Sequence, residues 1–560
     1  MATDAIQDLF QWQDWVVLVG YLLLTTWVGH QMRGKQASIK DFFLGGRSLP
    51  WQAVSGSIIA TEISGVTFIG VPGVIFAANG NFTYLQWAIG SIIARILIAR
   101  FFVRVYYEQE IYSPYDYMGR RLGNLAKTLA TVLFTIGSIL AQSVRVLVAA
   151  IPLQVVTGLA FEWCIVGIGL FAIVWTLMGG MRTVIWTDVL QFLLFTFGGL
   201  LALGWIVGHL DGGFPDLIST AKEFGRFEVL DTRLQKDLQF TLWVALFAVP
   251  FQNLGIFGTD QLMAQRMFCC RDAKAAGKAI IWSSVGQLLT LLMLLVGAAL
   301  FVHYHENPFT DTEIATLFGV NPSEADSVRQ SATLASNPDT GAVSNVMVPA
   351  ERDYVFPIWI VSVLPVGLSG LILAGVFAAA ISSLDSILAA LSQTTLSLIY
   401  HPERGNVRIS ESQLVFRSRL LVILWGFVLT GFTLVLKAAR ETIEIVPLAF
   451  GLTSYTVGPL LALFLASLWG KGSLRGLIVG AILSFLLVLF VRTDIWILFI
   501  KGGLISAETL AKLPTYQLNA TGDGLVPTIA YVWMWPITTA LTLACGLLWD
   551  RKGKPVSPSI

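Results

Sequence analysis

The stretch Gly375-Val-Phe-Ala-Ala-Ala-Ile-Ser-Ser-Leu-Asp-Ser386 places polar side chains in the middle of an apolar segment. Ser382 and Ser386 share one face of a helix because they are four residues apart, and Ser383 and Asp385 flank that face. An Asp at the centre of a membrane helix costs roughly 2.5–3.5 kcal/mol. Such residues commonly mark ion or substrate paths through a helix bundle.

This helix face offers the oxygen ligands that a hard cation such as sodium prefers. The hydroxyls of Ser382 and Ser383 would be joined by a backbone carbonyl one turn earlier, at Ala379. Helix packing is the alternative, since small residues and serines also line membrane helix interfaces without binding anything. The ionisable Asp385 favours the ion site over simple packing.

Two further apolar segments are interrupted by glycine and proline. Residues 56–73 contain Glu62 and end at Pro72-Gly73, and residues 248–261 contain Pro250, Gly255 and Gly258. Non-helical backbone at membrane depth is tolerated only where it lines a cavity or is buried in protein. Interrupted segments at corresponding places in two halves of a chain indicate a transporter binding site, although glycine and proline are also commoner in membrane helices generally.

The composition indicates a membrane protein. Of the 560 residues, 55% are hydrophobic and 13% are charged, whereas a soluble domain carries about 25% charged residues. Apolar runs of about 20 residues recur along the chain, which predicts an all-α integral membrane protein. The net charge of +1 gives no reason to expect a nucleic-acid partner, and the four cysteines are too scattered for a disulfide framework.

The apolar runs predict about 13 transmembrane helices. The first lacks the basic leader and cleavage site of a signal peptide, so we expect it to be retained. Residues 354–366 are apolar but short and contain Pro357 and Pro365, which predicts an interfacial helix. The predicted spans are 14–32, 51–72, 82–104, 125–158, 162–180, 184–208, 239–258, 277–303, 368–399, 414–437, 442–468, 474–491 and 525–549.

Basic residues predict the orientation. They gather in the loops after the odd-numbered spans and at the C-terminus, while the short opposite loops near 73–81 and 159–161 carry none. Lys and Arg favour the cytoplasmic side, so we expect the N-terminus outside and the C-terminus in the cytoplasm. The basic residues are Arg33, Lys35, Lys40, Arg47, Arg104, Arg120, Arg121, Arg182, Arg266, Arg271, Lys274, Lys278, Arg404, Arg408, Arg417, Lys471, Arg475, Arg551, Lys552 and Lys554.

Several motifs together resemble the sodium/solute symporter family, which includes transporters of sugars, proline, iodide, vitamins, sialic acid and monocarboxylates. They are Asp41-Phe-Phe-Leu-Gly-Gly-Arg-Ser-Leu-Pro50, Trp175 to Gln191, Asp260-Gln-Leu-Met-Ala-Gln-Arg266 and Ala378-Ala-Ala-Ile-Ser-Ser383. The resemblance implies a LeuT-type inverted repeat of five plus five helices with one leading and two trailing helices. The expected ranges are a leading helix and first cytoplasmic loop (1–50), repeat 1 (51–208), an external loop (209–238), repeat 2 (239–468, with the external loop 304–352), and two trailing helices with the cytoplasmic C-terminus (469–560).

The resemblance also implies the ion ligands. Family members hold a shared sodium ion with carbonyls of the first broken helix and of the serine-bearing helix, together with two hydroxyls. The matching positions are Ala60, Ile63, Ala379, Ser382 and Ser383. Some members bind a second cation, for which the matching positions are Asp188, Asp385 and Ser386. Asp385 stands where such members have a hydroxyl-bearing residue. The carboxylates of Asp188 and Asp385 could therefore hold a second cation or share a proton.

The candidate solute residues are polar or aromatic positions on the two broken helices and their neighbours: Glu62, Ser64, Thr67, Gln86, Arg145, Phe251, Asn253 and Ile256. Asn253 resembles sugar-transporting members. At three other positions the sequence differs from these members: Gln86 stands where they have a glutamate, Thr67 where they have a glutamine, and Ile256 where they have a tyrosine. These differences argue against a simple hexose as the solute.

Arg145 has two interpretations at this stage. It could hold a solute carboxylate bidentately, or it could pair with Glu62 or another acid as part of the structure. We expect two other arginines, Arg95 and Arg100, to extend toward the cytoplasmic surface. If Arg145 serves the solute, the solute is an organic or sugar acid.

The sequence therefore predicts a sodium-coupled symporter of a small polar solute in the plasma (inner) membrane, working by alternating access. Proton-coupled, sugar or amino-acid symport on the same fold is the main alternative, and a channel is disfavoured by the matched interruptions. We expect no enzyme activity, since no loop offers a nucleophile with a base or a metal-ligand spacing. The cluster His303, His305 and Glu306 is more typical of a solvated loop than of a metal site.

Overall fold

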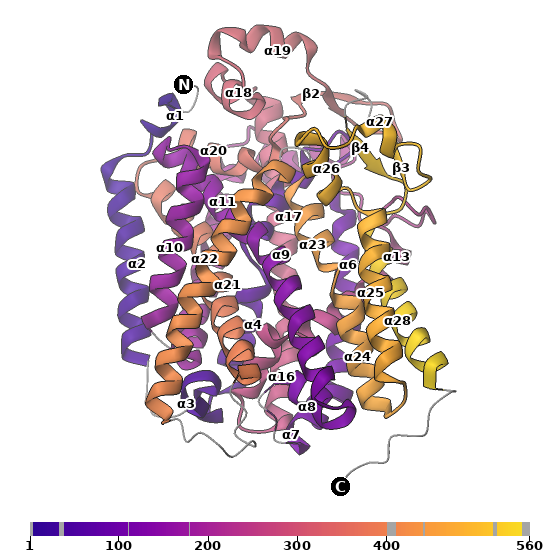
Figure 1. The fold of residues 1–560 in the computed structure, drawn as a ribbon. Helices are drawn as coiled ribbons and strands as arrows, with labels where there is room; N and C mark the ends of the chain where they lie inside the picture. Colours follow the sequence, from indigo (N-terminus) through magenta and orange to yellow (C-terminus); the bar gives the residue numbers. More distant parts are fainter. Residues whose placement is uncertain are drawn as a thin grey trace.

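The computed structural model describes residues 4–32, 39–109, 111, 113–178, 180–399, 410–440, 443–518 and 524–550. Long helices run roughly side by side through the molecule, and short helices and strands gather at one end (Figure 1). The first helix α1 (Asp4–Gln7) and the far end of the last helix α28 (Met534–Asp550) lie at opposite ends of this bundle. An odd number of membrane crossings requires this arrangement.

The leading part and the first repeat are helical throughout. The leading part contains α2 (Trp12–Met32), α3 (Ile39–Leu44) and a short 3-10 turn (Gly45–Arg47). The first repeat contains α4 (Trp51–Glu62), η2 (Val66–Gly70), α5 (Val71–Ile75), η3 (Phe82–Gln86), α6 (Trp87–Leu97), η4 (Ile98–Phe102), α7 (Val103–Glu108), α8 (Pro114–Leu122), α9 (Asn124–Thr157), α10 (Phe161–Met178) and α11 (Met181–Gly208).

The second repeat and the trailing helices follow the same pattern. The second repeat contains α13 (Leu242–Phe247), α14 (Val249–Asn253), η5 (Leu254–Thr259), α15 (Gln261–Phe268), α16 (Ala273–Trp282), a 3-10 turn (Ser283–Gly286), α17 (Gln287–Glu306), α20 (Val355–Ser362), α21 (Leu368–Ile399), α22 (Glu411–Arg440), α23 (Ile445–Thr453) and α24 (Val457–Trp469). The trailing helices are α25 (Leu474–Val491) and α28.

The remaining elements gather at one end of the bundle (Figure 1), in the external loops predicted at 209–238 and 304–352 and in the segment between α25 and α28. They comprise short helices and two antiparallel strand pairs, β1 with β2 and β3 with β4. Their bounds are α12 (Gly213–Glu223), α18 (Asp311–Phe318), α19 (Ala325–Ser331), β1 (Leu334–Ser336), β2 (Val343–Met347), α26 (Asp494–Lys501), α27 (Ala507–Leu510), β3 (Tyr516–Leu518) and β4 (Leu525–Pro527), with 3-10 turns at Pro322–Glu324, Arg352–Tyr354 and Tyr531–Trp533.

The predicted spans appear as helices in three forms. Within the described residues, nine helices are long and apolar enough to cross a membrane, and a bent pair, Trp51–Glu62 with Val66–Ile75, makes a tenth. A shorter apolar helix covers Phe161–Leu177. The predicted spans 82–104 and 239–258 are instead chains of short helices, interrupted by the π-helical segments η4 and η5.

Two sequence predictions need correction. The segment predicted as an interfacial helix forms α20, whose residues Val355–Val361 are all buried, so it is an internal packing element without the exposed face that an interfacial helix needs. The last predicted span begins too early, because residues 525–527 form β4 and the helical part starts at Tyr531. Of the basic residues behind the predicted orientation, Arg33, Lys35, Arg404, Arg408, Arg551, Lys552 and Lys554 lie outside the described residues.

Both interruptions predicted from glycine and proline are confirmed. The chain bends by 54° between α4 and the following helix, and Ile63 at the break is extended (φ −77°, ψ 92°). In the second repeat Asp260 is extended (φ −75°, ψ 134°) between η5 and α15. The break in the first repeat leaves the last carbonyls of α4 without helical partners at the place where the polar helix α21 passes.

Helix α21 lies inside the bundle. In its most apolar 18-residue window 94% of residues are buried, compared with 22% in α2, and it packs against α2, α4, α9, α11 and α22. A helix buried on all sides cannot turn its serines and its aspartate toward water or lipid headgroups. These polar groups must therefore find partners on neighbouring helices or bind an ion.

Candidate functional site

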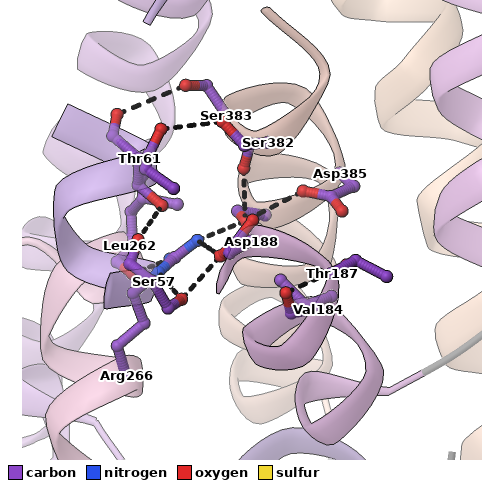
Figure 2. A network of polar contacts seen from close by, with 12 residues as sticks. Ser57, Thr61, Val184, Thr187, Asp188, Leu262, Arg266, Ser382, Ser383 and Asp385 are labelled. Carbon is purple, nitrogen blue, oxygen red and sulfur yellow. Dashed lines mark hydrogen bonds and ion pairs between the residues drawn. The ribbon is translucent and has the colours of Figure 1, made fainter. Parts of the chain in front are cut away.

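The serines of α21 reach the broken end of α4. Ser382 Oγ donates to the Ala60 carbonyl at 2.7 Å and lies 3.2 Å from the Ala379 carbonyl, while Ser383 Oγ donates to the Thr61 carbonyl at 3.3 Å (Figure 2). All of these residues are fully buried. The structure thus brings four of the five residues assigned to the shared sodium site into one cluster of hydroxyl and carbonyl oxygens.

Ile63, the fifth residue of that set, ends α4 and is also buried. Ile63 also lines the adjoining cavity. The Thr61 carbonyl, which the sequence did not single out, is the oxygen that Ser383 contacts.

Arg145 contacts the same carbonyl. Its Nη1 donates to the Thr61 oxygen at 2.9 Å, and its side chain lines the central cavity. One backbone carbonyl is therefore shared by Ser383 of the ion cluster and by Arg145 of the cavity. This contact links the two candidate sites directly.

The second predicted cation set contains an arginine of the protein itself. Arg266 Nη2 lies 3.0 Å from Asp188 Oδ2 and also contacts Ser386 Oγ, and Ser386 Oγ lies 2.9 Å from Asp385 Oδ1 (Figure 2). Ser57 Oγ donates to Asp188 Oδ2 at 2.5 Å. The sequence placed Arg266 among the basic loop residues, but it is 1% exposed. It does not mark the cytoplasmic surface but belongs to the buried ion network.

A central cavity of about 140 Å³ lies beside the sodium cluster, between the two broken helices, α6, α9, α17, α23 and α24. Of the residues assigned to the solute, it is lined by Glu62, Ser64, Thr67, Arg145, Asn253 and Ile256. Gln86 lies outside the lining, and its amide bonds the backbone of Thr83, Phe240 and Asp231. Phe251 of α14 also lies outside it.

Glu62 pairs with an arginine that the sequence placed at the membrane surface. Arg95 is 0% exposed and forms an ion pair with Glu62, so our expectation that Arg95 extends toward the cytoplasm was wrong. Gln287 Nε2 donates to the other Glu62 oxygen at 2.8 Å. Breaking a buried pair by removing one partner typically costs about 3–5 kcal/mol, which explains why an arginine stays inside the bundle.

This ion pair continues into a chain of hydrogen bonds that joins the two broken helices. Arg95 Nη1 donates to Ser91 Oγ at 2.9 Å, and Ser91 Oγ donates to Asn253 Oδ1 at 2.8 Å. Glu62 therefore already has an ion-pair partner within the protein, and Asn253 Oδ1 already has a hydrogen-bond donor. The interpretation of Arg145 as the structural partner of Glu62 does not apply, because Arg95 takes that role.

The sequence reasoning missed Ser57, Thr61, Arg95 and Arg266 as site residues. The two arginines could have been identified by counting the charged residues within the apolar segments. An acid at membrane depth needs a cationic partner, and Glu62 and Asp188 each have an arginine in another apolar or broken segment.

A helical bundle in which two interrupted helices enclose an oxygen-rich cation cluster and a polar cavity defines a class of protein, the ion-coupled secondary transporters with the LeuT-type fold. The chain belongs to the sodium:solute symporter family, whose family model matches residues 42–480. It is a multi-pass membrane protein that transports sodium together with a small solute, and it is not an enzyme.

Curated relatives cover most of the chain. A sodium/glucose cotransporter of Vibrio parahaemolyticus is 26% identical over 83% of this chain and 82% of its own length. A sodium/sialic acid symporter of Proteus mirabilis is 27% identical over 90% and 94%, and a sodium-coupled monocarboxylate transporter 2 of Bos taurus is 25% identical over 84% and 72%. These relatives carry chemically different solutes.

The fold also matches a solved structure. A Na⁺-coupled sialic acid symporter in a substrate-bound, outward-open state superposes with a TM-score of 0.76 and 23% identity, covering 98% of both chains. This likeness confirms the predicted LeuT-type all-α fold.

Proposed function

We propose that this protein imports a small carboxylate-bearing organic solute together with sodium by alternating access. The observation that carries the proposal is the Thr61 carbonyl, which Ser383 contacts at 3.3 Å and Arg145 at 2.9 Å. Sodium would be held by Ala60, Ile63, Ala379, Ser382 and Ser383. The solute carboxylate would be held by Arg145, whose planar guanidinium can bind a carboxylate bidentately.

Arg145 suits this role because it faces the cavity. Among the described residues it forms no ion pair, and the hydrogen bond of its guanidinium goes to a neutral carbonyl. Glu62 pairs with Arg95, while Asp260 caps the Leu262 amide at 2.8 Å and lines the same cavity within electrostatic range of Arg145. An incoming carboxylate can therefore contact the Arg145 guanidinium without breaking an ion pair, although it binds in the field of Asp260.

Sodium would couple to the solute by joining α21 to the broken end of α4. Sodium bound there would fix the Thr61 carbonyl and so fix the position of Arg145. Binding free energies couple reciprocally, so the solute should raise sodium affinity as much as sodium raises solute affinity. One sodium with one monoanion moves no net charge, so a tenfold sodium gradient alone, worth about 1.4 kcal/mol, sustains about a tenfold solute ratio. Two sodium ions per monoanion carry one net positive charge, which adds about 2.3 kcal/mol at 100 mV and raises the sustainable ratio to several thousand.

The direct test is uptake into proteoliposomes that contain the purified protein. We expect an inward sodium gradient to drive accumulation of labelled organic or sugar acids, with choline replacing sodium as the control. Uptake of a monoanion should increase when the interior is made negative if two sodium ions accompany it, and should not respond to voltage if one does. Uptake driven only by a pH gradient would contradict sodium coupling. Sodium-driven uptake of neutral sugars alone would contradict the proposal that the solute bears a carboxylate.

We further propose a second cation at the carboxylate pair. Asp188 and Asp385 are buried beside a single guanidinium, that of Arg266, which leaves one negative charge uncompensated at membrane depth. Asp188 Oδ1 and Asp385 Oδ2 have no hydrogen-bond partner within the described part of the chain. A sodium ion on these two oxygens, with Ser386 orienting Asp385, would balance the charge.

Two neighbouring side chains extend this ligand set. The buried Gln191 lies one helical turn after Asp188, and the Tyr21 hydroxyl of the leading helix α2 is buried beside it. Tyr21 lies beside Gln191 and within electrostatic range of both carboxylates. These oxygens are hard ligands of the kind that sodium prefers.

We expect Asp385→Asn to reduce the coupling ratio from two sodium ions per solute to one, because the variant removes the uncompensated charge. With a monoanionic solute, wild-type transport should then carry one net positive charge and the variant none, so uptake into proteoliposomes should depend on the membrane potential in wild type and not in the variant. The ratio is measured from the sodium and solute gradients at which net flux is zero. Tyr531→Phe, which changes a buried side chain and leaves both carboxylates in place, is the control. An unchanged ratio in Asp385→Asn would refute the second cation and leave single-sodium coupling intact.

We place the protein in the plasma (inner) membrane, and the basic loops favour a C-terminus in the cytoplasm. In that orientation the sodium gradient favours import, and the membrane potential adds to it when two sodium ions accompany each monoanion.

A further inference from the structure

Helix α9 presents a polar stripe to the cavity. Ser138, Gln142 and Arg145 are spaced i, i+4 and i+7, which places them on one helix face, and all three line the cavity. Gln142 lies about one turn from Arg145 along the axis and Ser138 about 10 Å from it, at 1.5 Å per residue. Polar recognition therefore extends beyond the proposed carboxylate position along the same wall.

The two neutral members of this stripe lack partners. Ser138 is 4% exposed and Gln142 is 8% exposed, and neither Ser138 Oγ nor Gln142 Oε1 has a hydrogen-bond partner within the described chain. A buried polar group without a partner costs about 1–3 kcal/mol, and native structures keep few of them. These two oxygens are suited to a molecule that enters the cavity.

Gln252 on the second broken helix supplies a third open group. It is 2% exposed and lines the same cavity. Its Oε1 accepts a hydrogen bond from Asn253 Nδ2 at 2.7 Å, which fixes the orientation of the Gln252 amide. Gln252 Nε2 then remains as a donor with no partner in the described structure.

Asn253, the residue that the sequence favoured for solute binding, is by contrast engaged. Its Nδ2 donates to Gln252 Oε1 and to the Val249 carbonyl at 3.1 Å, and its Oδ1 accepts from Ser91. Asn253 therefore acts on the solute through Gln252, as a positioning residue. The open hydrogen-bonding capacity of the cavity lies with Gln252, Gln142 and Ser138.

These three groups select a chemical class. Gln252 offers a donor, Gln142 an amide with both an acceptor oxygen and N–H donors, and Ser138 a hydroxyl that can do either. A hydroxyl group satisfies all of them because it both donates and accepts. An ammonium would leave the Gln252 donor unpaired, and an apolar chain would leave all three groups without partners.

We propose that the solute is a polyhydroxylated carboxylic acid whose hydroxyls are bound by Gln142, Gln252 and Ser138 while Arg145 binds the carboxylate. This inference rests on the proposed function, which assigns Arg145 to the carboxylate. The axial separation of about 10 Å between Ser138 and Arg145 requires hydroxyls several bonds from the carboxyl group. A sugar acid has this layout, whereas a short 2-hydroxy acid does not.

The test compares three probes of equal chain length on purified protein in sodium chloride: gluconate (acid with hydroxyls), hexanoate (acid without hydroxyls) and glucitol (hydroxyls without the acid). Binding is measured by isothermal titration calorimetry. We expect gluconate to bind at least tenfold more tightly than the other two. A site that is built to bond a hydroxyl discriminates strongly against an analogue that lacks it.

Variants then assign the discrimination to residues. Gln142→Leu and Gln252→Leu should each weaken gluconate binding about tenfold and leave hexanoate unchanged, while Arg145→Ala should weaken both acids. The control is Gln154→Leu, on the same helix, where the native glutamine bonds Tyr354 outside the cavity. Melting temperature in sodium, compared with wild type, shows whether each variant is folded, and Ser138→Ala is a milder second variant.

The outcomes separate this inference from the proposed function. Equal binding of gluconate and hexanoate would overturn the hydroxyl subsite and leave the carboxylate function standing. Tighter binding of glucitol than of either acid would overturn the proposed carboxylate function. Full gluconate preference in both glutamine variants would also overturn the subsite, because the discrimination would then arise elsewhere.

Discussion

Ser383→Ala is expected to weaken sodium binding by tenfold to hundredfold, which corresponds to about 1.4–2.8 kcal/mol. The hydroxyl of Ser383 is buried and contacts the Thr61 carbonyl at 3.3 Å, so the variant removes one oxygen of the cluster. Because Ser382 and the Ala60 carbonyl remain, the variant should keep residual binding.

The measurement is thermal stability of the purified protein in sodium chloride against choline chloride. A ligand that binds only the native state adds roughly 2.7 kcal/mol at 100 times its dissociation constant. A tenfold weaker site would add about 1.4 kcal/mol at the same sodium concentration, so the sodium-specific rise in melting temperature should fall by half or more.

Ser392→Ala is the matched control. Ser392 is a buried serine of the same helix, and its hydroxyl donates to the Ser418 carbonyl at 2.7 Å, away from the ion cluster. This variant should lower the melting temperature equally in both salts. A sodium response in Ser383→Ala equal to that of wild type would place the ion elsewhere.

Arg145→Ala is expected to reduce uptake of carboxylate solutes by about tenfold to hundredfold, since a hydrogen bond to a charged group contributes about 1.5–3 kcal/mol. Arg145→Lys should recover only part of the loss, because lysine keeps the charge but cannot form the planar bidentate contact. The measurement is sodium-driven initial uptake at several solute concentrations.

The same variants test the link through Thr61. In wild type the solute should raise sodium affinity, and in Arg145→Ala this mutual effect should disappear while sodium still stabilises the protein. Arg100→Ala, which changes an exposed arginine on η4, is the control and should transport normally. Undiminished carboxylate uptake by Arg145→Ala would assign the arginine a purely structural role.

The residues that the sequence analysis assigned to solute binding show which features of the site could be predicted. Their positions beside the two interrupted helices could be predicted, because glycine and proline break helices locally and leave the same signal in any context. The hydrogen-bond and ion-pair partners of these residues could not be predicted. Asn253 and Glu62 were assigned to the solute, yet both are bonded within the protein, while Gln142 and Gln252, which the sequence did not single out, have open atoms facing the cavity.

The arginines show the same limit. Arg266 reads as a basic loop residue and Arg95 as a surface residue, because each is followed by further positive charge in the sequence. In the folded protein each is buried against an acid from a distant segment, Asp188 for Arg266 and Glu62 for Arg95. Which acid meets which arginine depends on helix packing, and the sequence spacing of the partners does not specify it.

The sequence by itself determined the membrane class, the approximate spans, the two helix breaks and the polar face of α21. These features follow from local properties: the length of apolar runs, the backbone restrictions of glycine and proline, and helical periodicity. Tertiary structure alone decided that the Thr61 carbonyl joins Ser383 to Arg145, and that a guanidinium lies between Asp188 and Ser386. Those contacts join residues far apart in the chain, and a buried polar group takes whichever partner the packed helices bring within hydrogen-bond distance.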